Sequence, residues 1–193
     1  MRVGLFLMVF AAVMAHPAAA ADFVVEPGKP NEVVFLSKAP MESFEGKTRE
    51  ITGSLSLDPQ RLSGTIEAEF TVDLASLDTG IGLRNRHMRE NHLETDTYPT
   101  AVFKGGEITE ASAASLSTTP ATFTLTGTFT LHGVTQEMSV QAEAVQVEAG
   151  IQVIAIFEVK LSDYDIKRPK FLMLKLADEQ AVTVNFTATP KAS

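Results

Sequence analysis

Strict alternation of apolar and polar side chains dominates this sequence and limits what it can fold into. In "GTIEAEFTVDLASL", residues 64–77, the apolar residues recur at every second position, and "ATFTLTGTFTLHG", residues 121–133, repeats the pattern with threonines in between. A period of two puts alternate side chains on opposite faces of a β-strand, and β-branched threonine favours strands. The sequence therefore predicts an all-β protein whose strands each have one apolar face.

Similar segments raise the expected number of strands to about eight. They are residues 31–37, 49–58, 64–74, 100–109, 121–131, 137–147, 150–161 and 181–189. Ala149 and Gly150 predict a hairpin turn, and two helices are expected in the crossovers, one over 83–92 and a short one near 169–175 that Pro169 begins. Such a set of strands forms either a closed antiparallel barrel or a β-sandwich.

Small residues interrupt the apolar faces, and their role has two interpretations. An eight-stranded barrel has an interior that side chains fill or that holds one small ligand. The small residues either leave volume for a ligand or fit the taper of the barrel. They are Gly53, Ala68, Gly127, Ala142, Ala144, Ala155 and Ala188.

The first 21 residues have the features of a secretory signal peptide. Arg2 precedes an apolar run over residues 3–13, and alanines at 18–21 predict cleavage after Ala20 or Ala21. The run is too short to cross a bilayer, and no later segment approaches the required length of about 18 apolar residues. We expect an exported protein that does not span the membrane, with one domain over residues 22–193.

The charge balance excludes several classes of function. Loss of Arg2 with the signal peptide leaves 15 basic against 24 acidic residues, a net charge of −9. Such an acidic domain is unsuited to nucleic acid, because phosphate repulsion is not offset. The chain has no Cys, which excludes thiol nucleophiles, Cys-ligated zinc and iron–sulfur clusters.

Three segments resemble the YceI family of exported, lipocalin-like proteins. Residues 72–105 carry a Ser-hydrophobic-Asp-Thr-Gly motif, then an Arg-x-x-His-hydrophobic-Arg-like run, an acidic stretch ending in Tyr-Pro and a strand with a Phe. Residues 127–140 match the family's Gly-Val-Thr hairpin, and residues 161–186 resemble one branch's last crossover and strand. The matching residues are Ser76, Asp78, Thr79, Arg86, His87, Met88, Arg89, Tyr98, Pro99, Phe103, Gly133, Val134 and Thr135.

The chain also departs from the family pattern. Many members carry histidines on the first strand, where residues 31–47 have none. Many carry Arg and Gly late in the chain, where Leu161 and Asp165 stand here. Roles proposed for those polar residues therefore do not transfer to this protein.

The resemblance implies an eight-stranded antiparallel lipocalin-like barrel, with one or two short helices in crossovers, that holds a long apolar chain along its axis in the periplasm. We predict an exported lipid-binding protein that carries or stores a long-chain isoprenoid or similar amphiphile, such as a quinone, a polyprenyl lipid or a fatty-acid derivative. Two alternatives stay open: an accessory role in quinone or isoprenoid redox or metabolism, and a ligand-free structural β-sandwich.

Strand periodicity suggests which side chains would line the tunnel of such a barrel. Burial of an apolar tail contributes about 0.8 kcal/mol per CH₂, so a long tail is held without any catalytic group. The residues expected to line the tunnel are Phe70, Val72, Phe103, Phe123, Leu125, Phe129, Phe157 and Phe186.

Basic residues concentrate in the two crossovers. The residues predicted for a mouth that holds a ligand's polar head, such as a diphosphate, are Arg86, His87, Arg89, Lys167 and Arg168. In the alternative, Arg86 and Arg89 pair with Glu90, Glu94 or Asp96 and only pin the crossover to the barrel. A later apolar run, residues 171–174, either plugs the barrel end or gates it.

The histidines and acids do not form a pattern typical of catalysis or metal binding. His87 and His92 are five residues apart, away from a common helical face, and His132 belongs to a predicted turn. Asp163 and Asp165 are typical of solvated loop acids. We expect no enzyme, no catalytic residue, no metal site and no cofactor apart from a bound isoprenoid-type lipid. An exposed strand edge would allow a homodimer.

Overall fold

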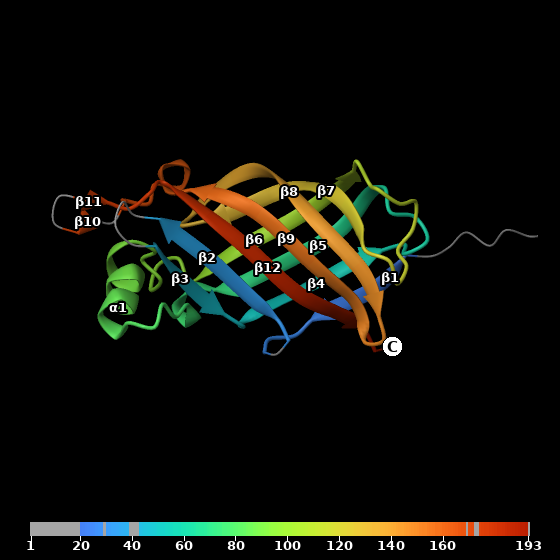
Figure 1. Cartoon of the computed structure of the whole chain (residues 1–193), viewed down its shortest axis with the longest axis horizontal. Helices are drawn as coiled ribbons and strands as arrows, with labels where there is room; N and C mark the ends of the chain where they lie inside the picture. The colour runs from blue at the N-terminus through green and yellow to red at the C-terminus, as the bar shows by residue number, and fades with distance from the viewer. Residues whose placement is uncertain (1–19, 29, 39–42, 169, 172–173, 193) are drawn as a thin grey trace, which may run out of the picture.

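The computed structural model describes residues 20–28, 30–38, 43–168, 170–171 and 174–192. Most of this part of the chain is β-strand, as the alternation predicts (Figure 1). The strands are β1 (Ala21–Val25), β2 (Glu32–Lys38), β3 (Ser43–Thr48), β4 (Ile51–Leu57), β5 (Gly64–Asp73), β6 (Thr100–Thr109), β7 (Ala121–Leu131), β8 (Val134–Val147), β9 (Gly150–Lys160), β10 (Lys170–Phe171), β11 (Leu174–Lys175) and β12 (Glu179–Pro190). The helices are α1 (Gly82–Asn91) and the 3-10 helices η1 (Leu74–Ser76) and η2 (Leu161–Tyr164).

Eight antiparallel strands close into a barrel. Their order is β1-β4-β5-β6-β7-β8-β9-β12, and β1 pairs back onto the end of β12. The predicted eight-stranded antiparallel barrel is therefore confirmed, and the β-sandwich alternative is wrong, because pairing between the first and last strands joins the two edges of the sheet.

The hairpin of β2 and β3 lengthens the barrel at one end. β12 pairs with β2 over residues 180–185 and with β1 at residues 189–190, so β1 and β2 lie end to end against the same strand. β3 and β4 also follow each other along the chain: β3 pairs with β2, and β4 pairs with β1. On its other side β3 makes an isolated bridge between Lys47 and Asp78 in the described chain. Sequence reasoning missed β1 and β3, which are short segments.

Burial follows the predicted alternation along the strands. On β5, Ile66 and Ala68 are buried, whereas Glu67 and Glu69 are exposed. Two interior glycines fit against aromatic rings: a Cβ at Gly53 would collide with Phe70, and one at Gly127 would collide with Phe103 and a neighbouring carbonyl. Some small residues thus accommodate rings, whereas alanines such as Ala142 border open volume.

The crossovers agree only in part with the sequence expectations. The helix predicted over 83–92 is confirmed as α1, and the turn predicted at 149–150 joins β8 to β9. The short helix predicted near 169–175 is wrong, because Lys170 pairs with Lys175 and Phe171 with Leu174 in a small antiparallel ladder. A helix of under two turns gains too few hydrogen bonds to offset its nucleation. Residues 169, 172 and 173 lie outside the described residues.

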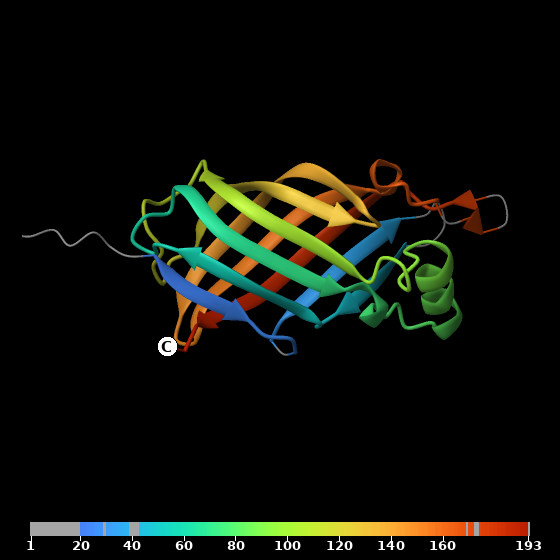
Figure 2. The ribbon, with the colours of Figure 1, turned by 180° about the vertical axis from the view of Figure 1, so that it is seen from behind.

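The two ends of the barrel differ in construction. α1 and the β10–β11 hairpin lie together at one end, and the C-terminus and the loop before β7 lie at the other (Figures 1 and 2). No α-helix in the described part of the chain is long and apolar enough to span a membrane. The predicted signal peptide lies outside the described residues, apart from Ala20 and Ala21.

Candidate functional site

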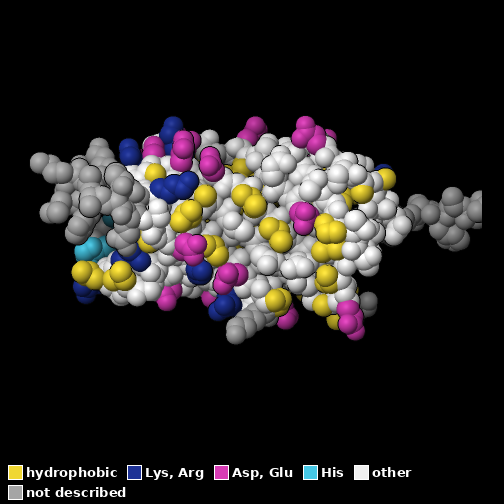
Figure 3. Space-filling model, in the orientation of Figure 1, with side chains coloured by type: hydrophobic (Ala, Val, Ile, Leu, Met, Phe, Trp, Pro, Cys, Tyr) yellow, Lys and Arg dark blue, Asp and Glu magenta, His cyan; other side chains and the backbone are white. Residues whose placement is uncertain are grey.

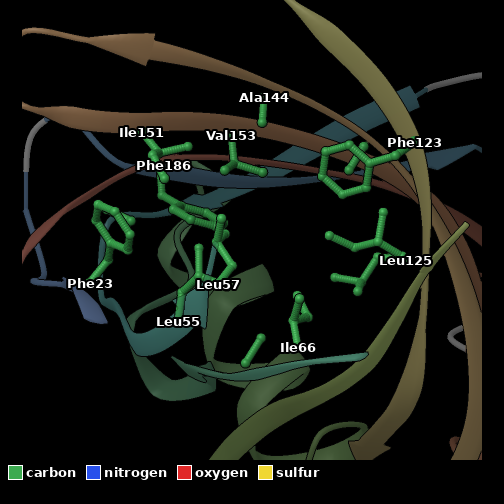
Figure 4. Close-up of a cluster of buried hydrophobic side chains, with 14 of the residues drawn as sticks. Phe23, Leu55, Leu57, Ile66, Phe123, Leu125, Ala144, Ile151, Val153 and Phe186 are labelled. Atoms are coloured by element: carbon green, nitrogen blue, oxygen red, sulfur yellow. The ribbon is translucent and has the colours of Figure 1, made fainter. Parts of the chain in front are cut away.

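A cavity of about 1020 Å³ occupies the interior of the barrel. Side chains from opposite walls, among them Leu55, Ile66, Phe123 and Phe186, point toward a shared open centre (Figure 4). The alternation of the strands explains this arrangement, because each strand turns its apolar face inward. A concave, mostly apolar volume of this size is typical of a site for a hydrophobic small molecule.

All eight residues predicted for a tunnel line this cavity: Phe70, Val72, Phe103, Phe123, Leu125, Phe129, Phe157 and Phe186. The rings of Phe70 and Phe186 lie 4.7 Å apart, and those of Phe129 and Phe157 lie 5.8 Å apart. Each pair joins strands that are not adjacent in the sheet, β5 with β12 and β7 with β9, so the rings pack against each other inside the barrel. Contact of these side chains with a ligand stays a prediction.

Two loops cover the end of the cavity opposite α1. Leu62 and Leu116 are 1% and 4% exposed, and both line the cavity. The amide of Leu62 donates to the carbonyl of Ala114 at 2.7 Å, and that of Leu116 donates to the carbonyl of Pro59 at 2.8 Å. These bonds tie the two loops into an apolar cover.

At the other end, Asn85 fixes α1 to the segment that precedes it. Its Oδ1 accepts from Thr79 N at 2.8 Å and from Thr79 Oγ1 at 2.6 Å, and its Nδ2 donates to Asp78 Oδ1 at 2.6 Å. The amide of Gly80 donates to the same Asp78 oxygen at 2.8 Å. The hydrogen bonds from Gly80 and from Asn85 hold the pKa of Asp78 below its ordinary value. The Asp-Thr-Gly motif therefore anchors the helix.

Arg84 lines the cavity from the first turns of α1. Its Nε donates to Thr79 Oγ1 at 2.8 Å and its Nη2 donates to the Thr79 carbonyl at 2.7 Å. The guanidinium carbon lies 4.1 Å from the centre of the Phe44 ring, which is a cation–π contact. These contacts fix the orientation of the guanidinium.

The predicted mouth residues Arg86, His87, Arg89, Lys167 and Arg168 lie in α1 and in the segment before β10. His87 lines the cavity, whereas Arg86 is exposed on α1. Arg89 Nη2 donates to the carbonyl of Leu77 at 2.9 Å. The ion pairs of the described residues do not include the alternative pairing of Arg86 or Arg89 with Glu90, Glu94 or Asp96.

Hydrogen bonds form within the later crossover and between this crossover and the end of α1. Arg168 Nε and Nη2 donate to the carbonyl of Leu176 at 3.1 and 2.7 Å. His92 Nδ1 lies 2.9 Å from the carbonyl of Lys167, and burial lowers the pKa of this imidazole. Of the predicted plug or gate over 171–174, residues 172 and 173 lie outside the described residues.

Polar side chains gather at the α1 end of the cavity. The polar members among its described lining residues are Ser37, Arg84, His87, His92 and Gln180. Sequence reasoning missed Ser37 and Gln180. The alternation along the strands could have identified both residues. Ser37 continues the inward-facing row of Val33 and Phe35, and Gln180 precedes Val182 in another inward-facing row.

His132 joins two of the family-like segments. It occupies the β7–β8 turn with φ 51°, beside Gly133 with φ 77°, and its ring lies 4.4 Å from that of Tyr98. Its Nδ1 lies 3.1 Å from the Tyr164 carbonyl, and its Nε2 lies 3.9 Å from Glu94 Oε2. In the described part of the chain, no three His, Asp or Glu side chains converge as metal ligands.

The outer surface at the α1 end combines apolar and basic side chains with histidine, whereas acidic side chains spread along the barrel walls (Figure 3). Ile81 and Leu83 are both exposed and both line the cavity, so they form part of its rim. This arrangement suits an amphiphile whose tail enters the barrel and whose head stays at the α1 end.

Comparisons with known proteins agree with this architecture. A UPF0312 protein of Vibrio parahaemolyticus is 27% identical over 179 residues, which cover 86% of this chain and 89% of the relative. A UPF0312 protein of Photorhabdus laumondii is 26% identical over 164 residues, with coverage of 79% and 80%.

Two solved structures share the fold. BcnA of Burkholderia cenocepacia superposes with a TM-score of 0.72 at 22% identity, covering 82% of this chain and 96% of its own. A polyisoprenoid-binding domain from Saccharophagus degradans superposes with a TM-score of 0.67 at 19% identity, covering 89% and 99%. The model of the YceI-like domain matches residues 25–188, so this chain belongs to the YceI family, as its motifs predict.

Proposed function

We propose that this protein binds a long-chain isoprenoid or similar amphiphile and carries or stores it in the barrel, without catalysing a reaction on it. The observation that carries the proposal is the cavity of about 1020 Å³, apolar along most of its length, with its polar lining residues at one end. Each CH₂ group buried there would contribute about 0.8 kcal/mol. The similar fold of the Saccharophagus polyisoprenoid-binding domain supports an isoprenoid tail.

In this proposal the tail lies among the eight tunnel residues and the head lies at the α1 end. His87 borders the cavity there, and Arg86, Arg89, Lys167 and Arg168 belong to the surrounding crossovers. An accessory role in redox chemistry or metabolism would call for polar groups deep in the tube. The described lining residues at the covered end, such as Leu62 and Leu116, are apolar, which favours carriage.

Export to the periplasm is part of the proposal. Residues 1–21 would be removed as a signal peptide, leaving the domain over 22–193. N-terminal sequencing of the protein recovered from its compartment should find Ala21 or Asp22 as the first residue, and an uncleaved Met1 would contradict export. A homodimer through an exposed strand edge stays a prediction, which light scattering of the purified protein tests.

Mass spectrometry of lipid extracted from the natively purified protein tests the binding function. The expected result is a stoichiometric long-chain amphiphile, and a lipid-free protein would contradict carriage. Ala142→Phe would fill part of the cavity, since Ala142 is buried and lines it. Glu143→Phe is the matched control, because Glu143 is exposed on the outer face of the same strand. Ala142→Phe should lose most of the bound lipid, and the control should retain it.

A further inference from the structure

The polar residues that line the cavity differ in charge and in the hydrogen bonds that they already make. Arg84 and His87 belong to the first turns of α1, whereas Ser37, His92 and Gln180 come from β2, from the end of α1 and from β12. The second group consists of a hydroxyl, an imidazole and an amide. Their hydrogen-bonding atoms define which heads fit the site.

Ser37 and Gln180 lie directly opposite each other across the β2–β12 pair. Ser37 is 1% exposed and Gln180 is 7% exposed, and both line the cavity. Ser37 Oγ has no hydrogen-bond partner among the described residues. A buried hydroxyl without a partner is unfavourable in an apolar interior, so a hydrogen bond from a bound ligand would recover the lost free energy.

Gln180 presents both kinds of hydrogen-bonding group. Its Nε2 donates to the carbonyl of Ala177 at 2.8 Å, which identifies this atom as nitrogen and orients the amide. The amide of Ala177 donates in turn to the Lys38 carbonyl at 2.7 Å, next to Ser37. Oε1 of Gln180 is therefore an oriented acceptor on the residue that pairs with Ser37.

His92 adds a second acceptor at the same end. A carbonyl only accepts hydrogen bonds, so the contact with Lys167 requires the proton on Nδ1 and leaves a lone pair on Nε2 of the neutral ring. The segment that follows Lys167 is linked to this end too, because Arg168 binds the Leu176 carbonyl, one residue before Ala177.

An anionic head finds few donors within this group. Phosphate oxygens only accept, and they would face the acceptors Gln180 Oε1 and His92 Nε2. The guanidinium of Arg84 is held against Thr79 and the Phe44 ring by contacts that engage two of its five N–H groups. A hydroxyl, by contrast, could donate to one of these acceptors and accept from Ser37 Oγ.

We propose that Ser37, Gln180 and His92 form a recognition site for an uncharged head that both donates and accepts hydrogen bonds, of which a hydroxyl is the simplest, on a long apolar tail. This inference rests on the proposed function and narrows its ligand class. Arg86, Arg89 and Arg168, which do not line the cavity, then lie outside the head-binding site.

Three probes of equal carbon number distinguish the contribution of the head to affinity from that of the tail. They are geranylgeraniol, geranylgeranyl diphosphate and the hydrocarbon phytane. Each is titrated into protein expressed from the full chain and stripped of lipid, with displacement of the fluorescent probe N-phenyl-1-naphthylamine as the readout. Geranylgeraniol should bind about tenfold or more tightly than either of the others. Equal affinities, or tightest binding of the diphosphate, would overturn the head site while leaving lipid binding intact.

Ser37→Ala tests the residue directly. It should lower the affinity for geranylgeraniol about tenfold and leave that for phytane unchanged. Ser139→Ala is the matched control, because Ser139 is exposed on the outer face of β8. Equal losses for both probes would contradict recognition by the hydroxyl. The ranking of the three probes on the unmodified protein decides the matter even if Ser37→Ala does not fold. Failure of all three to bind would overturn the proposed function itself.

Discussion

The two ends of the barrel differ in the side chains that line the cavity. At the covered end, Leu62 and Leu116 close the cavity with apolar side chains that backbone hydrogen bonds hold in place. At the α1 end, polar side chains line the cavity, and the helix itself has no buried residue among its members. In the proposed function, an amphiphile would therefore bind with its tail toward the covered end.

The difference also concerns stability. Nearly fully buried leucines close the covered end, whereas α1 is held by hydrogen bonds around Asn85 and Thr79 and by the partly buried Met88. Segments with few buried apolar contacts open at lower free energy than the core. We therefore expect substitutions at the two ends to differ in their effects on stability.

The largest expected effect is at the covered end. Leu62→Ala should lower the free energy of unfolding by about 2–5 kcal/mol, because it removes buried methyl groups and enlarges the cavity. Leu83→Ala at the rim is the matched control and should change it by less than about 0.5 kcal/mol, since Leu83 is 55% exposed. Chemical denaturation measures both, and equal losses would break the contrast between the ends.

The next effect falls on the turn that supports the α1 end. Gly133 has φ 77°, and a Cβ added there would lie 2.7 Å from Tyr98 Cε1. Gly133→Ala should therefore destabilise the protein by about 1–3 kcal/mol through backbone strain and displacement of the ring. Gly82→Ala is the control, because nothing lies within 4 Å of its added Cβ. Thermal unfolding of both variants tests this, and a neutral Gly133→Ala would contradict it.

A smaller, local effect is expected at Asn85. Asn85→Ala removes the acceptor of Thr79 and the donor to Asp78, which together contribute about 1 kcal/mol, as helix caps do. Hydrogen exchange should quicken across α1 and stay unchanged at the covered end. Asn91→Ala, at the exposed end of the helix, serves as the control. Faster exchange throughout the barrel would mean that the two ends unfold together.

Sequence periodicity predicted the walls better than the ends. The inward faces follow from period two, and Phe123 and Phe186 line the cavity, whereas their contact with a ligand stays a prediction. The pairing of β1 with β12 joins residues about 165 positions apart, such as Val24 and Thr189, and local pattern carries no information on it. The helix α1 was predicted, but alternation does not reveal the side-chain hydrogen bonds by which Asn85 anchors it to Thr79.

The polar residues of the cavity were harder to predict from the sequence than the apolar ones. The predicted mouth relied on charge, which singled out Arg86 and Arg89, yet Arg89 binds a backbone carbonyl and Arg86 is exposed. The cavity-lining Ser37 and Gln180 are uncharged and sit at the ends of apolar rows. Extending each alternating row by one position, regardless of residue type, would have found them.

The smallest expected effect is the response of the α1 end to pH. Burial has the largest effect and lowers the pKa of His92 below its ordinary value of 6.5; the Lys167 carbonyl raises it by less, and the charge of His87 lowers it slightly further. The unfolded or opened state therefore takes up a proton at higher pH than the folded state does. Stability that is fully present above pH 6.5 is lost as the pH falls from 6.5 through the pKa of the folded state.

NMR titration of the His92 ring should give a midpoint below 6.5, and exchange of the α1 amides should quicken as the pH falls below that value, after correction for intrinsic rates. The amides around Leu62 and Leu116 serve as the internal control, because apolar side chains and backbone bonds hold that cover. His92→Gln should remove the acid-dependent part of the change at α1. A midpoint above 6.5, or an equal acid response at the covered end, would contradict the assignment of a neutral, partly buried imidazole to the α1 end alone.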